Sequence, residues 1–267
     1  MIRQVSGADD PDVAAYRHIG DHDWLRANGL FVGEGRLIVD RLMSSGRHRI
    51  ESVLITPPAF SALERRLTAL DAPVLIAMPA LVTEITGFDF HRGCLALAAR
   101  GVPCQSPDVG NNGPLLGLEA IGNPDNVGGL FRTASAFGVS AVLVDTRTAD
   151  PFYRKSIRTS MGAVLDMPFA TVEDWPVEVD RLRNIGYRIV ALTPAATAEP
   201  LSTFVQQTGL ERLLVLVGTE GSGLSARVLD AADHRLFIPI SSTVDSLNVT
   251  VAAGIALARI AEARPRT

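Results

Sequence analysis

The sequence of 267 residues contains only two cysteines, Cys94 and Cys104. Two cysteines cannot build a disulfide framework, and a structural zinc site needs about four ligands, so we expect no metal. No stretch approaches the roughly 18 consecutive apolar residues of a membrane span. The first ten residues also lack the basic start and apolar run of a secretory signal. We therefore expect a cytoplasmic protein without a membrane partner.

Positive charge is also scarce. The 25 basic residues are outnumbered by 29 acidic residues, which gives a net charge of −4, and Lys155 is the only lysine. This balance argues against a protein that coats nucleic acid non-specifically. Any contact with RNA must come from a local patch, in which arginine would predominate.

Internal repeats and low-complexity tracts are absent, as are the glycine-rich Gly-x-Gly-x-x-Gly and Walker-type loops. Solenoids, propellers and the common nucleotide-binding enzymes are therefore disfavoured. What the sequence does contain is a globular composition, with 47% hydrophobic and 20% charged residues. The length suits two domains of ordinary size, each with its own core.

The segment from Gly101 to Pro114 breaks the pattern, because glycine, proline and polar residues replace the helical and strand periods. We interpret 103–114 as a linker between a domain at 1–102 and a domain at 115–267. In both domains short apolar runs alternate with helix-like stretches, which predicts α/β folds. The runs of the second domain suit strands buried on both faces and so predict a mostly parallel sheet.

Three segments of the second domain place polar or glycine residues directly after a predicted strand, where open α/β sheets bind ligands. The first follows the strand that ends near Ile121 and contains Asn126, Gly128 and Arg132 in the pattern Asn-x-Gly-x-x-x-Arg. Proline and aspartate just before Asn126 suit the start of a helix. Gly128 permits close approach of another backbone.

The second segment follows a strand ending near Val217 and contains Gly218, Glu220 and Gly223 in the pattern Gly-x-Glu-x-x-Gly. Ser225, just beyond, suits a helix N-cap. Glycine-rich loops after strands also bind phosphates or simply make tight turns. This segment therefore leaves the function open when it is considered alone.

In the third segment, Ile238 and a proline end a strand, and Ser-Leu-Asn-Val from Ser246 to Val249 precedes the terminal helix. We expect Ser246 or Asp245 to open that helix. Ser246 and Asn248 could be no more than capping residues. The small residues at 252–256 allow close packing of the helix against the sheet.

Together, the order and spacing of the three segments resemble the SpoU (TrmH-like) branch of the SPOUT RNA methyltransferases, whose three motifs all match. The resemblance extends from Leu115 to Ala261. It includes, more loosely, an N-terminal L30e-like RNA-binding domain that opens with Phe31–Val39. Asn123, Ile240 and Thr250 depart from residues frequent in the family without removing a motif side chain.

The resemblance implies a C-terminal trefoil knot, a homodimer, and the cofactor S-adenosylmethionine held in the knot mainly by backbone groups. It implies transfer of a methyl group to a ribose 2′-hydroxyl of RNA. The cofactor contacts it suggests are Thr193, Gly218, Ile238 and Leu247. The catalytic residues it suggests are Asn126, Arg132, Glu220, Ser246 and Asn248.

The family role of Arg132 as the base conflicts with the chemistry of guanidinium, which stays protonated at any working pH. We expect Arg132 to bind a phosphate and stabilise the developing 2′-oxyanion instead. Asn126, Ser246 and Asn248 would orient the ribose or Arg132. For Glu220, a structural and a chemical role both remain open, as does the identity of the general base.

A local basic patch is expected at Arg154, Lys155 and Arg158, within a stretch of four basic residues and one acid. We interpret it as an RNA contact, although a solvated helix face is the alternative. We expect ribosomal RNA to be the substrate, because the N-terminal domain resembles the extensions with which relatives act on ribosomal RNA.

Three alternatives compete with ribosomal RNA methylation. They are a transfer RNA 2′-O-methyltransferase, a non-catalytic RNA-binding or assembly factor that retains the fold, and a nucleotide-binding enzyme acting on a small molecule. The intact polar motif residues argue against the second, and the missing nucleotide-binding loops against the third.

Overall fold

The structure is a computed structural model that describes residues 1–101, 104, 113–195, 197–207 and 209–264. The chain forms two compact units. The first comprises Met1–Val102 together with Phe152–Asp166, and the second comprises Pro103–Pro151 and Met167–Thr267. Most of the expected linker at 103–114 lies outside the described residues. The basic segment around Arg154 is grouped with the first unit, although it follows a strand of the second.

The first unit is built on a five-stranded mixed sheet in the order β1-β4-β3-β5-β2. Strand β5 runs antiparallel to both β2 and β3, while β1, β4 and β3 are parallel. The strands are β1 (Ile2–Gln4), β2 (Leu30–Glu34), β3 (Ile50–Ile55), β4 (Val74–Ile76) and β5 (Cys94–Ala99).

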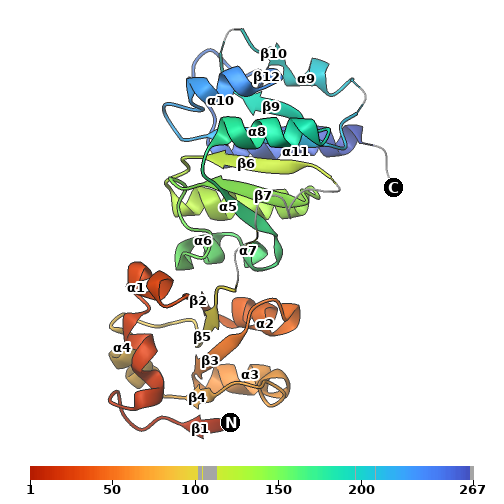
Figure 1. Ribbon diagram of the computed structural model, residues 1–267. Helices are drawn as coiled ribbons and strands as arrows, with labels where there is room; N and C mark the ends of the chain where they lie inside the picture. Colours follow the sequence, from red (N-terminus) through yellow and green to blue (C-terminus); the bar gives the residue numbers. More distant parts are fainter. Residues whose placement is uncertain (102–103, 105–112, 196, 208, 265–267) are drawn as a thin grey trace. The chain divides into compact units, whose positions relative to one another are not determined.

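Helices cover both faces of this sheet (Figure 1). Tyr16 is fully buried between the sheet and the helices of one face, where its hydroxyl pairs with Ser52 at 2.8 Å. Burial raises the pKa of Tyr16. The helical elements are η1 (Pro11–His18), α1 (His22–Ala27), α2 (Arg36–Ser45), α3 (Pro57–Leu67), α4 (Pro79–Thr86), α6 (Arg154–Thr159) and α7 (Ala163–Asp166).

The second unit contains a seven-stranded, wholly parallel sheet in the order β10-β12-β9-β11-β6-β7-β8. Its central strands are almost fully buried, as expected for a parallel sheet covered on both faces. The strands are β6 (Leu115–Glu119), β7 (Ala141–Asp145), β8 (Phe169–Val172), β9 (Arg188–Leu192), β10 (Glu199–Pro200), β11 (Leu213–Gly218) and β12 (His234–Phe237).

Helix α8 (Trp175–Asn184) lies on one face of this sheet, and α5 (Pro124–Ala136) and α11 (Val249–Ala263) lie together on the other (Figure 1). Short helices α9 (Leu201–Phe204) and α10 (Ala226–Ala231) complete the unit. No helix in the described part of the chain is both long and apolar enough to cross a bilayer.

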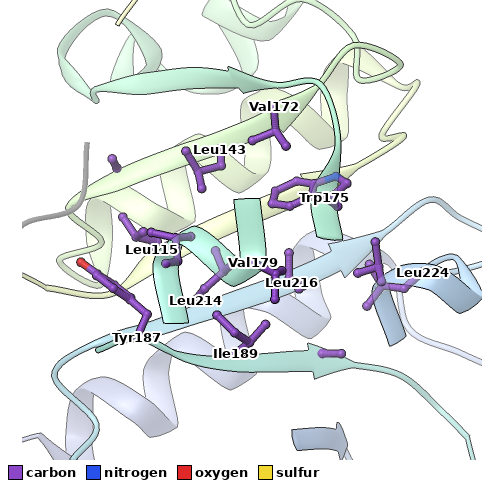
Figure 2. Close-up of a cluster of buried hydrophobic side chains, with 14 of the residues drawn as sticks. Leu115, Leu143, Val172, Trp175, Val179, Tyr187, Ile189, Leu214, Leu216 and Leu224 are labelled. Carbon is purple, nitrogen blue, oxygen red and sulfur yellow. The ribbon is translucent and has the colours of Figure 1, made fainter. Parts of the chain in front are cut away.

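Figure 2 shows the core between the sheet and α8, where Trp175 lies among aliphatic side chains of several strands. Gly117 of β6 makes room for this core, because a Cβ there would lie 2.5 Å from Leu216 and 2.7 Å from Trp175. The glycine therefore sits where a tryptophan and a leucine need the space that any side chain would fill.

The predicted α/β class and mostly parallel sheet are confirmed. The expected start of the last helix was wrong. The helix begins at Val249, and Asn248 is its N-cap, with its side-chain oxygen accepting from the backbone N–H of Thr250 at 2.9 Å. Ser246 and Asp245 lie before it in the loop.

Strand order determines which loops meet. Strands β12, β9, β11 and β6 are neighbours, so their carboxyl ends lie side by side at one edge of the sheet. Each of the three motif segments follows one of these strands, and Thr193 follows the fourth. The fold thus assembles segments that are more than 100 residues apart in the sequence.

Candidate active site

A cavity of about 350 Å³ opens at the carboxyl ends of β9, β11 and β12. This volume is within the range of pockets that bind small molecules and cofactors. Its lining combines apolar side chains such as Leu192 and Leu236 with glycine backbone and a few polar groups. Such a lining suits a ligand with both apolar and polar parts.

The four residues suggested as cofactor contacts, Thr193, Gly218, Ile238 and Leu247, all line this cavity. They come from three different strand ends and from the loop before α11. The structure thus brings them together, and their role in binding stays a prediction.

The glycine-rich loop after β11 folds back tightly on the strand. A Cβ at Gly218 would lie 2.3 Å from the backbone of Gly223 and Leu224, a distance that side chains do not tolerate. The N–H of Gly223 donates to the carbonyl of Thr219 at 3.0 Å, which closes the loop. Only glycine at 218 permits this turn, so the cavity wall depends on it.

A buried carboxylate anchors the far end of the same loop. Glu119, the last residue of β6, is 3% exposed, and its Oε2 accepts from the N–H of Ser225 at 2.8 Å. Its Oε1 accepts from Arg147 at 3.0 Å. Both oxygens are satisfied, as a buried carboxylate requires. Glu119 was not predicted as a functional residue, although an acidic residue at the end of a buried apolar run is a signal in the sequence.

Asp145 holds the neighbouring turn after β6. Its Oδ1 accepts from the backbone N–H of Ala120 at 2.9 Å and from the Thr148 hydroxyl at 2.7 Å. Ala120 adopts a left-handed conformation with φ of 55°, which is unfavourable for alanine. The hydrogen bond from its N–H to Asp145 helps to hold this conformation. The hydrogen bond from Arg147 to Asp145 raises the pKa of that guanidinium. This network was not predicted.

Three of the predicted catalytic residues form one hydrogen-bonded cluster. Oε1 of Glu220 accepts from Nδ2 of Asn126 at 2.8 Å and from Nδ2 of Asn248 at 2.9 Å. The same Nδ2 of Asn248 lies 3.1 Å from Oδ1 of Asn126, to which it also donates. The side chains come from α5, the loop after β11 and the cap of α11. We refer to Asn126, Glu220 and Asn248 as the polar cluster.

The close approach of α5 and α11 holds this cluster together. A Cβ at Gly129 of α5 would lie 2.9 Å from the side chain of Thr250 in α11. The missing side chain allows the two helix starts to come near each other, so that Asn126 and Asn248 can touch.

The other two predicted catalytic residues are outside the cluster. Ser246 lines the cavity. Arg132 is exposed on α5 and makes no hydrogen bond or ion pair with the described residues, nor does it line the cavity. Its guanidinium is thus available for a partner other than the described residues.

The predicted basic patch lies in the first unit, on α6. Arg154 is engaged there, because its guanidinium lies 3.6 Å from Glu34 and over the ring of Phe88. Lys155 is half-buried and Arg158 is exposed. Of the three, Arg158 is the one most accessible to an RNA phosphate.

Within the described residues, no group of three His, Cys, Asp or Glu side chains could hold a metal ion. Both cysteines are free thiols. Burial raises the pKa of Cys94 to about 12, so this thiol stays protonated.

The sequence matches the model of the SpoU rRNA methylase family over residues 114–258, which is more than half of the chain. It is 34% identical over 267 aligned residues to an uncharacterized tRNA/rRNA methyltransferase of Mycobacterium tuberculosis, covering 96% of this chain and 90% of that protein. It is 33% identical over 141 residues to the 23S rRNA (guanosine(2553)-2'-O)-methyltransferase RlmP of Bacillus subtilis, covering 53% of this chain and 55% of that one.

The fold is similar to that of an AdoMet-bound rRNA methyltransferase from Sinorhizobium meliloti, whose crystal structure superimposes with a TM-score of 0.83. The match covers 98% of each chain at 23% sequence identity. The likeness extends over both units and concerns the fold alone.

Replacing Gly218 by alanine should destroy the cavity wall. The added Cβ meets backbone rather than a flexible side chain, so the loop must shift, at a cost of about 1–3 kcal/mol typical of overpacking. If binding must restore the original loop position, we expect affinity for S-adenosylmethionine to fall by about 5- to 150-fold, because 1.4 kcal/mol corresponds to a factor of ten. Calorimetric titration measures this.

The matched control is Gly122→Ala, whose Cβ would have no heavy atom within 4 Å. This variant should bind the ligand like the wild type. Equal affinities for Gly218→Ala and Gly122→Ala would show that the loop does not form the binding wall.

Proposed function

The chain belongs to the SpoU rRNA methylase family, and on this basis we propose that it transfers a methyl group from S-adenosylmethionine to a ribose 2′-hydroxyl of RNA. The main support is that the second and third motif segments line one cavity, while Asn126 of the first segment hydrogen-bonds to Glu220 on that lining. The relative RlmP is named for this reaction on a guanosine of 23S rRNA.

The cavity fits the cofactor. Leu192, Val217 and Leu236 supply apolar surface suited to an adenine, and the strand-end backbone around Thr193 and Gly218 offers hydrogen-bonding groups. When bound, S-adenosylmethionine supplies an electrophilic methyl group on a positively charged sulfur. The chain's own contribution is to position the 2′-oxygen in line with that methyl group and to take up its proton.

Arg132 is proposed to bind the RNA backbone and stabilise charge on the reacting 2′-oxygen. A planar guanidinium is suited to two parallel hydrogen bonds to a phosphate. Its exposure and lack of a described partner are consistent with a group that engages substrate rather than the protein interior.

We propose ribosomal RNA as the substrate class and the first unit, with its L30e-like resemblance, as the part that contacts it. Arg158 is exposed there for a phosphate contact, with Arg154 and Lys155 beside it. Transfer RNA is the alternative.

The knotted path implied by the resemblance stays a prediction.

A homodimer is proposed from the outer surface of the two site helices. Val251 and Ile255 are one turn apart on α11 and are 50% and 36% exposed, an apolar stripe that a second copy would cover. On α5, Arg132 and Ala136 are likewise exposed one turn apart. A two-fold contact through these helices would bring Arg132 of one copy close to the other.

Mapping of 2′-O-methylated nucleotides in total RNA from cells with and without the gene tests the function. We expect one or more sites in ribosomal RNA to lose methylation when the gene is deleted and to regain it on complementation. A site in transfer RNA would select the alternative substrate. Identical maps in both strains would contradict the proposed activity.

Arg132→Lys should slow methyl transfer by roughly 10²-fold, as for loss of one oxyanion donor, because lysine keeps the charge but loses the planar fork. Affinity for S-adenosylmethionine should stay within a few-fold of wild type, since Arg132 does not line the cavity. Arg227→Lys, an exposed arginine on α10, is the control and should be fully active. Near wild-type turnover by Arg132→Lys would remove Arg132 from the mechanism.

Ile255→Glu should convert the dimer into monomers, because a buried unpaired carboxylate is strongly unfavourable. The variant should also lose methyl transfer, because Arg132 of one copy would no longer lie close to the other. Light scattering at micromolar concentration measures the mass. Ile185→Glu, at the end of α8 and 39% exposed, makes the same change away from α5 and α11 and should leave the dimer intact. A wild-type protein that is monomeric and active would refute the dimer.

A further inference from the structure

Methyl transfer to a hydroxyl oxygen releases a proton, which passes either to a side chain of the site or to water. This inference rests on the proposed function. Arg132 cannot receive the proton, because a guanidinium is already protonated at any working pH. A side-chain acceptor has to be sought among the other residues at the cavity.

Among the described residues that line the cavity, Glu220 is the only one with an ionisable side chain. The rest are apolar residues, glycines, threonines, Ser246 and Asn248. Neutral hydroxyl and amide groups are poor proton acceptors, whereas a carboxylate can act as a general base. The composition of the lining thus singles out one group.

The hydrogen bonds of the polar cluster show how the carboxylate is held. Oδ1 of Asn248 accepts from the backbone N–H of Thr250, so its Nδ2 must face Glu220. That Nδ2 also donates to Oδ1 of Asn126, so Nδ2 of Asn126 must face Glu220 as well. Both amides are oriented as donors, and both point at the same oxygen, Oε1.

The second carboxylate oxygen is left unused. No described residue donates a hydrogen bond to Oε2 of Glu220, and the side chain is exposed at the cavity. Two donors fix one oxygen and so limit rotation of the carboxylate, which presents the other oxygen in a defined position. This arrangement is suited to an acceptor that must meet a substrate hydroxyl.

We propose that Oε2 of Glu220 accepts the proton of the ribose 2′-hydroxyl during methyl transfer. The 2′-oxygen forms a bond to the methyl carbon as the bond between that carbon and sulfur breaks. The electron pair of the broken bond stays on sulfur, which becomes a neutral thioether. The proton passes to Oε2 and then to solvent, to which the exposed carboxyl has access.

The alternative is that Glu220 only fixes the glycine-rich loop against Asn126 and Asn248. Glu220→Gln separates the two roles. Glutamine retains a carbonyl oxygen that can accept from both amides, and it replaces the free oxygen by an NH₂ group that cannot accept a proton. A purely structural role therefore tolerates this change, and a proton-acceptor role does not.

The assay uses the full-length protein, radiolabelled S-adenosylmethionine, and ribosomal RNA or ribosomes from cells that lack the gene. We expect Glu220→Gln to methylate about 10²- to 10⁴-fold more slowly, the usual contribution of a general base. Its affinity for S-adenosylmethionine by calorimetry and its thermal unfolding midpoint should match the wild type. Glu211→Gln, the same change at an exposed site, should be normal in all three measurements.

A second variant, Glu220→Ala, creates space for an external carboxylate. Added formate should accelerate its methyl transfer in a concentration-dependent way, whereas chloride at equal ionic strength should not. Acceleration by formate together with a slow, well-folded Glu220→Gln supports the proposal.

Three outcomes would overturn it. These are a Glu220→Gln rate within threefold of wild type, a parallel loss of cofactor affinity in that variant, or no effect of formate on Glu220→Ala. Failure of the proposed function itself is recognised separately, because the wild-type protein would then form no 2′-O-methyl ribose on either RNA preparation.

Discussion

The site depends on one steric constraint, the contact between Gly218 and the backbone of Gly223 and Leu224. Because no Cβ intervenes, the loop after β11 turns back within van der Waals distance of its own strand. That turn forms a wall of the cavity and places Glu220 beside the neighbouring strand ends. A larger residue at 218 would move every group that the loop positions.

Buried hydrogen bonds then hold the loop in that position. Glu119 receives the N–H of Ser225 at the loop's exit, and Asp145 receives the N–H of Ala120 at the turn toward α5. Both acids are almost fully buried and both also contact Arg147, which offsets the cost of burying their charges. Two carboxylates and one arginine thus brace the β6 and β11 loops against each other.

The hydrogen bonds of Glu119 and Asp145 also decide which charged side chain is left at the cavity. With Glu119 and Asp145 engaged by Arg147 and backbone, Glu220 is the single ionisable side chain on the described lining. Its partners are two neutral amides rather than an arginine. One of its oxygens therefore stays available for chemistry, while Arg132 presents its charge on the outer surface of α5.

The sequence by itself determined the fold class, the long strands and the three loops, because buried apolar runs, glycines and caps are local signals. It also placed Gly218 and Glu220 at a strand end. The strand order was decided only by tertiary packing, as were the meeting of Asn126 with Asn248 and the role of Glu119. The reason is physical. Strand neighbours and cross-chain hydrogen bonds join residues about 100 positions apart, and no local pattern encodes which of them will meet.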